Sequence, residues 1–134
     1  MTASDKTIDK IKKSILIHAI ESWKGNYKTA NRHFKDYTNQ ICALFQDGYG
    51  LDTMHMFLND DEAAAKFVGA YFLLPYDTKK CQKTLKSICS VQTYGIGPNA
   101  KTLLEEWKNG RLKFPVLEHG KVVYKERNQL MPDK

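Results

Sequence analysis

Residues 60–74 constrain the fold of this chain more than any other stretch. The sequence there is Asp-Asp-Glu-Ala-Ala-Ala-Lys-Phe-Val-Gly-Ala-Tyr-Phe-Leu-Leu, which leaves almost no polar face when it is wound as a helix. A helix that is apolar all round must be covered on several sides. In a chain of 134 residues the covering helices have to come from both flanks. The segment therefore predicts the central helix of an all-α domain.

The flanking sequence has the periodicity that this prediction requires. Residues 4–23 and 27–45 carry apolar side chains at steps of three and four, and Trp23 closes the first apolar stripe. Gly25 interrupts the pattern between the two segments, as glycine does after a helix C-terminus. We therefore expect two long antiparallel helices, followed by shorter helices over 51–58, 60–74, 78–91 and 97–109.

Polar residues at the helix ends predict where several of these helices begin. Asn59 or Asp60 is expected to cap the central helix, and Asp77 or Thr78 to cap the next one. The fold class predicted from these patterns is an all-α stack of about six helices, arranged as antiparallel pairs over residues 1–113. Two successive pairs, 51–74 and 78–109, look like copies of one unit, as in an α-solenoid.

The pattern changes after Gly110, where β-branched residues surround a His-Gly dipeptide. Residues 114–124 predict either a small β-hairpin or an irregular tail laid against the helices, and the sequence does not decide between them. We expect the residues after Lys125 to be mobile. Residues 114–134 are accordingly treated as a C-terminal tail, separate from the helical domain.

Charge is distributed unevenly along the chain. The formal net charge is +6, but residues 1–77 contain 9 Lys and Arg against 10 Asp and Glu, whereas residues 78–134 contain 12 against 5. The two parts therefore carry −1 and +7. A basic excess confined to one part predicts an acidic partner, which could be a protein surface or a phosphate backbone.

The basic excess includes a stripe of lysines along the predicted helix 78–91. Three of its four lysines fall within a narrow arc opposite the apolar side, with no acidic residue among them. A solvated helix face is one interpretation, and a patch that docks an acidic surface is the other. Tyrosine is favoured at the centres of interfaces, and connecting loops often carry binding residues. The predicted partner-binding residues are Lys79, Lys80, Lys83, Lys86, Tyr76, Tyr94, Asn99 and Lys101.

Patterns that could indicate catalysis, a cofactor or a metal site have simpler structural explanations in this sequence. The stretch from Gly95 to Ala100 fits the G-x-G-x-x-G/A dinucleotide fingerprint, but helical periodicity precedes it where the fingerprint needs a strand. The four histidines and three cysteines lack zinc-ligand spacing. We therefore expect no catalytic residues, no cofactor and no metal, and a plain turn between helices at the glycine motif.

The sequence also indicates a compartment. No apolar run approaches the roughly 20 residues that span a bilayer, and three unpatterned cysteines, Cys42, Cys81 and Cys89, are typical of buried thiols in a reducing environment. The chain has no recognisable secretory leader. These features predict a cytoplasmic protein without a membrane-spanning segment.

Residues 24–115 resemble the small bacterial HEAT-like, armadillo-type helical domains that form a family of unknown function. The resemblance rests mostly on packing positions: Gly25 to Asn31 with Phe34, Gly50-Leu51 and Leu58, Ala64-Ala65 with Leu73 to Pro75, and Asn99 to Lys101 with Leu103 to Trp107 and Gly110. It implies a HEAT-like stack and a protein-binding scaffold, with no catalytic residues to carry over.

Similar small helical domains occur as immunity proteins, which neutralise the toxins of bacterial competitors. By analogy of fold, the resemblance implies a monomeric protein that occludes a cognate protein toxin. The alternative hypothesis is a basic nucleic-acid-binding protein, because the +7 part of the chain is compatible with phosphate contacts.

Overall fold

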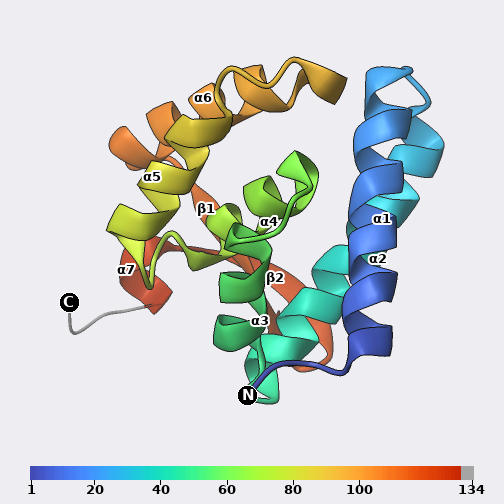
Figure 1. Cartoon of the computed structure of the whole chain (residues 1–134). Coiled ribbons are helices and arrows are strands. Elements are labelled where there is room, and N and C mark those ends of the chain that lie inside the picture. The colour runs from blue at the N-terminus through green and yellow to red at the C-terminus, as the bar shows by residue number, and fades with distance from the viewer. Residues whose placement is uncertain (131–134) are drawn as a thin grey trace.

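Residues 1–130 of the computed structural model are described here, and they form a layered set of helices followed by one β-hairpin (Figure 1). The described elements in chain order are α1 (Asp5–Trp23), α2 (Tyr27–Gln46), α3 (Gly50–Leu58), α4 (Ala63–Leu73), α5 (Thr78–Ile88), the 3-10 turn η1 (Thr93–Gly95), α6 (Ile96–Lys108), β1 (Lys113–Glu118), β2 (Lys121–Glu126) and α7 (Arg127–Leu130). The prediction of a mostly helical fold is confirmed, with a small antiparallel sheet added.

The helix α4 lies at the centre, as its sequence predicts. It contacts α1, α3, α5 and α6, and Ala65, Ala70 and Leu73 on different sides of it are buried. Gly69 allows α3 to approach α4 closely, because a Cβ atom there would lie 2.8 Å from Cβ of Phe57 and 3.0 Å from the Met54 carbonyl oxygen. Small side chains thus let α4 be covered on several sides within a short chain.

The long helices α1 and α2 pair as an antiparallel hairpin. Ser4 caps α1 by accepting a hydrogen bond from the Thr7 N–H, and Gly25 adopts a φ of +82° in the turn between the helices. Ile11 and Ile15 on the predicted stripe are buried, but Trp23 is 65% exposed. The apolar stripe of α1 therefore ends one turn before Trp23, since the helix there runs past the core.

Several predicted helix ends differ from those in the structure. The N-cap of α4 is Glu62, because Asp60 accepts a hydrogen bond from the Glu62 N–H in the preceding turn and pairs with Lys12 of α1 at 2.6 Å. The helix α5 ends at Ile88, three residues earlier than expected. The helix α6 begins at Ile96, after η1, which places Pro98 in its first turn.

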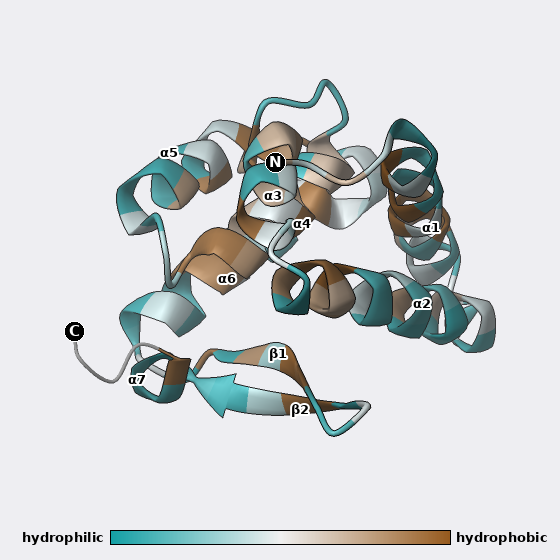
Figure 2. Ribbon diagram, turned by 90° about the horizontal axis from the view of Figure 1, so that it is seen from below, coloured by the Kyte–Doolittle hydropathy of each residue, from teal (hydrophilic) through white to brown (hydrophobic). Residues whose placement is uncertain are grey.

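The C-terminal segment forms a hairpin, which decides between the two alternatives left open by the sequence. Its strands β1 and β2 are antiparallel, and the two-residue turn between them, His119 and Gly120, has φ values of +52° and +77°. Such a turn matches the twist of the strands. In Figure 2 the hairpin lies along one side of the helices, with β1 as the strand nearer to them. Phe114 of β1 is buried and stacks on Tyr71 of α4, so the hairpin shares the core of the helices.

The segment that follows the hairpin packs onto it. Residues 127–130 form the turn α7, in which the Arg127 guanidinium lies 4.6 Å from the centre of the Trp107 ring and Leu130 contacts the core. The prediction of a mobile segment after Lys125 is therefore corrected as far as Leu130. Residues 131–134, to which the same prediction applied, lie outside the described residues.

The close approach at Gly69 yields a prediction about stability. Replacing Gly69 with alanine gains up to about 1 kcal/mol of helix propensity but drives a methyl group into α3, and overpacking costs about 1–3 kcal/mol. We expect Gly69→Ala to lower the free energy of unfolding in a urea titration. The control Thr102→Ala, at an exposed position of α6, should leave it unchanged or slightly higher. A stabilised Gly69→Ala variant would contradict this packing.

Candidate interaction surfaces

The face of α5 that points to solvent carries the four lysines predicted from the sequence. Lys79, Lys80, Lys83 and Lys86 are all exposed, while Cys81, Leu85 and Ile88 on the opposite side are buried. Within residues 1–130, none of the four lysines forms an ion pair. We call these four residues the α5 lysine face.

The start of α5 is unfavourable for a helix. Lys79 and Lys80 lie in the first turn, where the positive end of the helix dipole disfavours cations, and this turn contains no acidic residue. Asp77 occupies the N-cap position but makes no side-chain capping bond. Its carboxylate contacts Nε2 of His55 at 3.1 Å, so it links α5 to α3 instead of capping α5.

The aromatic and amide residues predicted to join this face lie beyond its two ends. Tyr76 precedes α5 and stacks on Phe45, while Tyr94 and Asn99 follow α5. The 11 residues of α5 span about 16 Å at 1.5 Å per residue. Lys101 is exposed on α6. The predicted site is therefore a lysine face with separate aromatic groups at either end, and not one continuous cluster.

Tyr94 and Asn99 are brought together in a small cleft against α1. The cleft has a volume of about 80 Å³, and His18, Ser22 and Tyr37 contribute its other polar side chains. Burial lowers the pKa of His18, so that imidazole is neutral at pH 7. Small-molecule sites occupy about 300–1,000 Å³. In the described conformation the cleft is too small for a cofactor.

Backbone packing explains the glycine motif at residues 95–100. Gly97 lies in the first turn of α6, where a Cβ atom would be only 2.3 Å from the Cys89 carbonyl oxygen and 2.5 Å from that of Val91. The Gly97 N–H donates to the Val91 carbonyl at 2.8 Å. The motif follows α5 and η1 and no strand precedes it in the described chain, so Gly97 serves close packing between chain segments.

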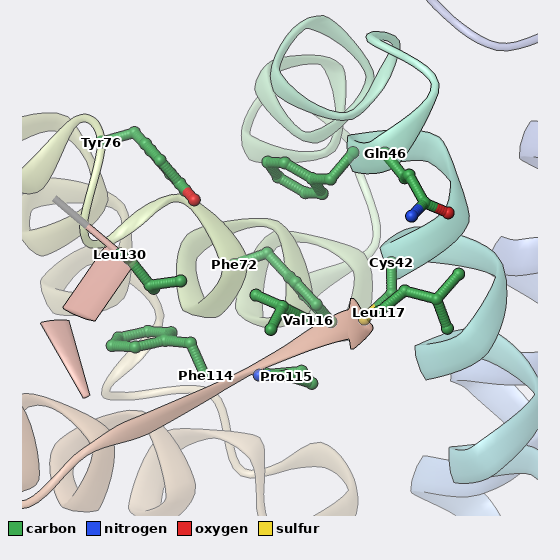
Figure 3. Close-up of a pocket in the computed structure, with 10 residues that line it drawn as sticks. Cys42, Gln46, Phe72, Tyr76, Phe114, Pro115, Val116, Leu117 and Leu130 are labelled. Atoms are coloured by element: carbon green, nitrogen blue, oxygen red, sulfur yellow. The ribbon is translucent and has the colours of Figure 1, made fainter. Parts of the chain in front are cut away.

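A pocket at the base of the hairpin has no counterpart in the sequence analysis. It has a volume of about 220 Å³ and lies between α2, α4 and β1. Phe72, Phe114 and Leu130 provide apolar lining, and Gln46 and Tyr76 are polar residues that also line it (Figure 3). Burial raises the pKa of the Cys42 thiol to about 11. That thiol therefore stays protonated and weakly nucleophilic at neutral pH.

A second opening that the sequence did not predict separates α2 from β2. It has a volume of about 480 Å³ and is lined by α2 residues 31–39 and by Val122 and Tyr124. Both openings join residues more than 70 positions apart. Local patterns carry no signal for them, because they exist only once the hairpin has docked.

Residues 1–130 contain neither a metal-type cluster of side chains nor a membrane-spanning helix. The described part of the chain contains no group of three or more His, Cys, Asp or Glu side chains placed to hold a metal ion. Each helix in the same range is too short or too polar to cross a bilayer.

No family model, curated protein or solved structure matches this chain. The interpretation of its surfaces therefore rests on its own geometry and charge.

The unfavourable start of α5 predicts a stability change of opposite sign at its two ends. Lys79→Glu places an anion at the positive end of the dipole and should stabilise the chain by about 0.3–1 kcal/mol. Lys86→Glu, in the last turn of the same face, should destabilise it by a similar amount. Urea titrations at low salt measure both changes, and about 1 M NaCl should abolish them. Equal changes in the two variants would rule out the dipole as their cause.

Proposed function

We propose that this chain is a non-catalytic protein-binding domain that docks an acidic surface of a partner through the α5 lysine face. The observation that carries the proposal is the absence, within residues 1–130, of any ion pair to these four lysines, two of which stand where they weaken their own helix. Local rules of helix stability are commonly broken where a residue serves function.

The order of the helices supports a HEAT-like stack for this domain. The pairs α1–α2, α3–α4 and α5–α6 follow one another, and each pair contacts the next: α1 with α4, α2 with α3, and α4 with both α5 and α6. Stacks of helix pairs present broad surfaces to partners. In such a stack α5 is an outer helix of the last pair, with its lysines free to meet another molecule.

The most specific form of the proposal is an immunity protein that binds and occludes a cognate bacterial toxin. The α5 lysine face would speed encounter by electrostatic steering, which raises association rates more than affinity. Tyr76, which is 41% exposed and precedes α5, would supply aromatic contact area. Occlusion of the toxin's active surface requires no chemistry from this chain, and this part of the proposal rests on analogy of fold.

Nucleic-acid binding is the second candidate, favoured by the +7 charge of residues 78–134. Arginine provides the bidentate contacts that read bases. Both arginines of that part of the chain are engaged: Arg111 pairs with Glu106 at 3.1 Å, and Arg127 stacks on Trp107. Protein binding is therefore the better-supported function, because the exposed basic groups of α5 are point charges on lysine.

A charge-reversal experiment tests the role of the lysine face. We expect the triple variant Lys79→Glu, Lys83→Glu, Lys86→Glu to slow association with the product of the adjacent open reading frame by about tenfold and to flatten its salt dependence. The matched control reverses Lys6, Lys10 and Lys13 of α1, which have the same helical spacing and are also exposed. Acidic residues accompany them, so their reversal should change the rate by less than about twofold.

The outcomes separate the candidates. Equal rates for the two triple variants would reject the α5 lysine face as the docking site. Tight binding of random oligonucleotides in a gel-shift titration, falling steeply between two salt concentrations and lost in the α5 variant, would favour nucleic acid instead.

A further inference from the structure

One edge of the β-hairpin remains open, and the geometry of the turn shows which backbone groups it offers. In a two-residue hairpin the residues flanking the turn, here Glu118 and Lys121, exchange hydrogen bonds, and bonded and non-bonded pairs then alternate. Val122 and Tyr124 fall in non-bonded pairs, so their N–H and C=O groups point away from β1.

Three contacts of this chain agree with that alternation. Pro115, which has no N–H, is paired with Tyr124, a position where the ladder needs no donor. The Glu126 N–H points outward and donates to Oε1 of Gln129 at 2.8 Å. On β1, the outward Lys113 carbonyl accepts a hydrogen bond from the Tyr71 hydroxyl at 2.6 Å. These contacts satisfy the outward Lys113 carbonyl on β1 and the outward Glu126 N–H on β2. The outward backbone groups of Val122 and Tyr124 have no such partner among the described residues.

Val122 and Tyr124, whose backbone N–H and C=O groups point away from β1, also line one side of the opening of about 480 Å³ between α2 and β2, here called the β2 groove. Phe34, Lys35, Thr38 and Asn39 line it from α2. Within residues 1–130, no hydrogen bond outside the hairpin reaches the backbone of Val122 or Tyr124. Two residues that line the groove thus also belong to a strand edge that is unpaired within the described residues.

The side chains of the groove define what would bind there. Phe34 and the 49% exposed ring of Tyr124 offer apolar surface. Lys35 is the charged residue of the lining, and it is exposed and forms no ion pair within residues 1–130. Charge complementarity therefore favours an acidic occupant. A second copy is disfavoured, because the β2 strand of another copy carries two lysines, Lys121 and Lys125, against one acidic residue, Glu126.

We propose that the β2 groove binds an extended segment of a partner protein, with apolar and acidic side chains, which adds to β2 as a third strand. The main-chain bonds to Val122 and Tyr124 provide affinity, and pockets for alternate side chains provide specificity. The acidic side chain of the segment pairs with Lys35. This site is separate from the α5 lysine face, and the inference does not rest on the function proposed for that face.

A library of random peptides of about nine residues, long enough for one strand, tests the proposal on the full chain. Enriched peptides are then synthesised, and their binding is measured by fluorescence anisotropy. We expect enrichment of sequences that alternate apolar residues with others and contain an acidic residue. Lys35→Glu should weaken binding by about tenfold, and the control Lys28→Glu, exposed on the same helix outside the groove, by less than about twofold.

Methylation of single backbone amides in the bound peptide tests strand pairing without any risk to the fold of the chain. Each N-methyl group removes one donor, so affinity should fall about tenfold at every second residue and change little at the residues between. Absence of enriched peptides, a flat methylation profile, or equal effects of Lys35→Glu and Lys28→Glu would overturn the proposal. A dimeric mass that the bound peptide leaves unchanged, with β2 buried in the dimer, would overturn it as well.

Discussion

The close approach of α3 and α4 at Gly69 is the contact on which the rest of the structure depends. The Gly69 backbone lies against Phe57 and the Met54 carbonyl. On other sides of α4 the buried residues Ala65 and Ala70 also have small side chains. A short helix can be surrounded by four others only if its own side chains leave room for them. Because α4 is covered in this way, α5 and α6 have a fixed support, and the opposite side of α5 must point outward.

The N-terminus of α5 shows a conflict between local and tertiary preferences. Asp77 is the residue that would cap the helix, yet its carboxylate contacts Nε2 of His55 instead. The other ring nitrogen of His55 lies 2.8 Å from the Leu51 carbonyl oxygen. The contact ties the end of α3 to the start of α5. The first turn of α5 then carries two lysines and no side-chain capping bond, so the stability of the helix comes from burial of Cys81, Leu85 and Ile88 and not from its own ends.

The outward backbone groups on the β1 edge and the β2 edge of the hairpin are protected to different extents. On β1, Pro115 lacks a donor and Tyr71 occupies the Lys113 carbonyl, so this edge is blunted where it faces the helices. On β2, the edge is closed only near its end, where Gln129 accepts from Glu126. Open strand edges are a risk for aggregation, and proteins usually protect them. The asymmetry leaves backbone groups available beside a groove that also carries an unpaired lysine within the described residues.

The sequence by itself determined the approximate positions of the helices, the central place of α4, the antiparallel pairing of α1 and α2, and the lysine stripe of α5. Each follows from periodicity, small residues and glycine within one segment. It did not decide the structure of residues 114–124, because an isolated two-stranded hairpin has only marginal stability. This hairpin is stabilised by packing of Phe114 against Tyr71 and Trp107. The exposure of Trp23 and the contact between Asp77 and His55 could not be predicted from the sequence, because they depend on segments that are distant in the chain. Only the tertiary structure brought Tyr94 and Asn99 into a cleft with Ser22 and created the β2 groove, because both depend on how whole elements dock.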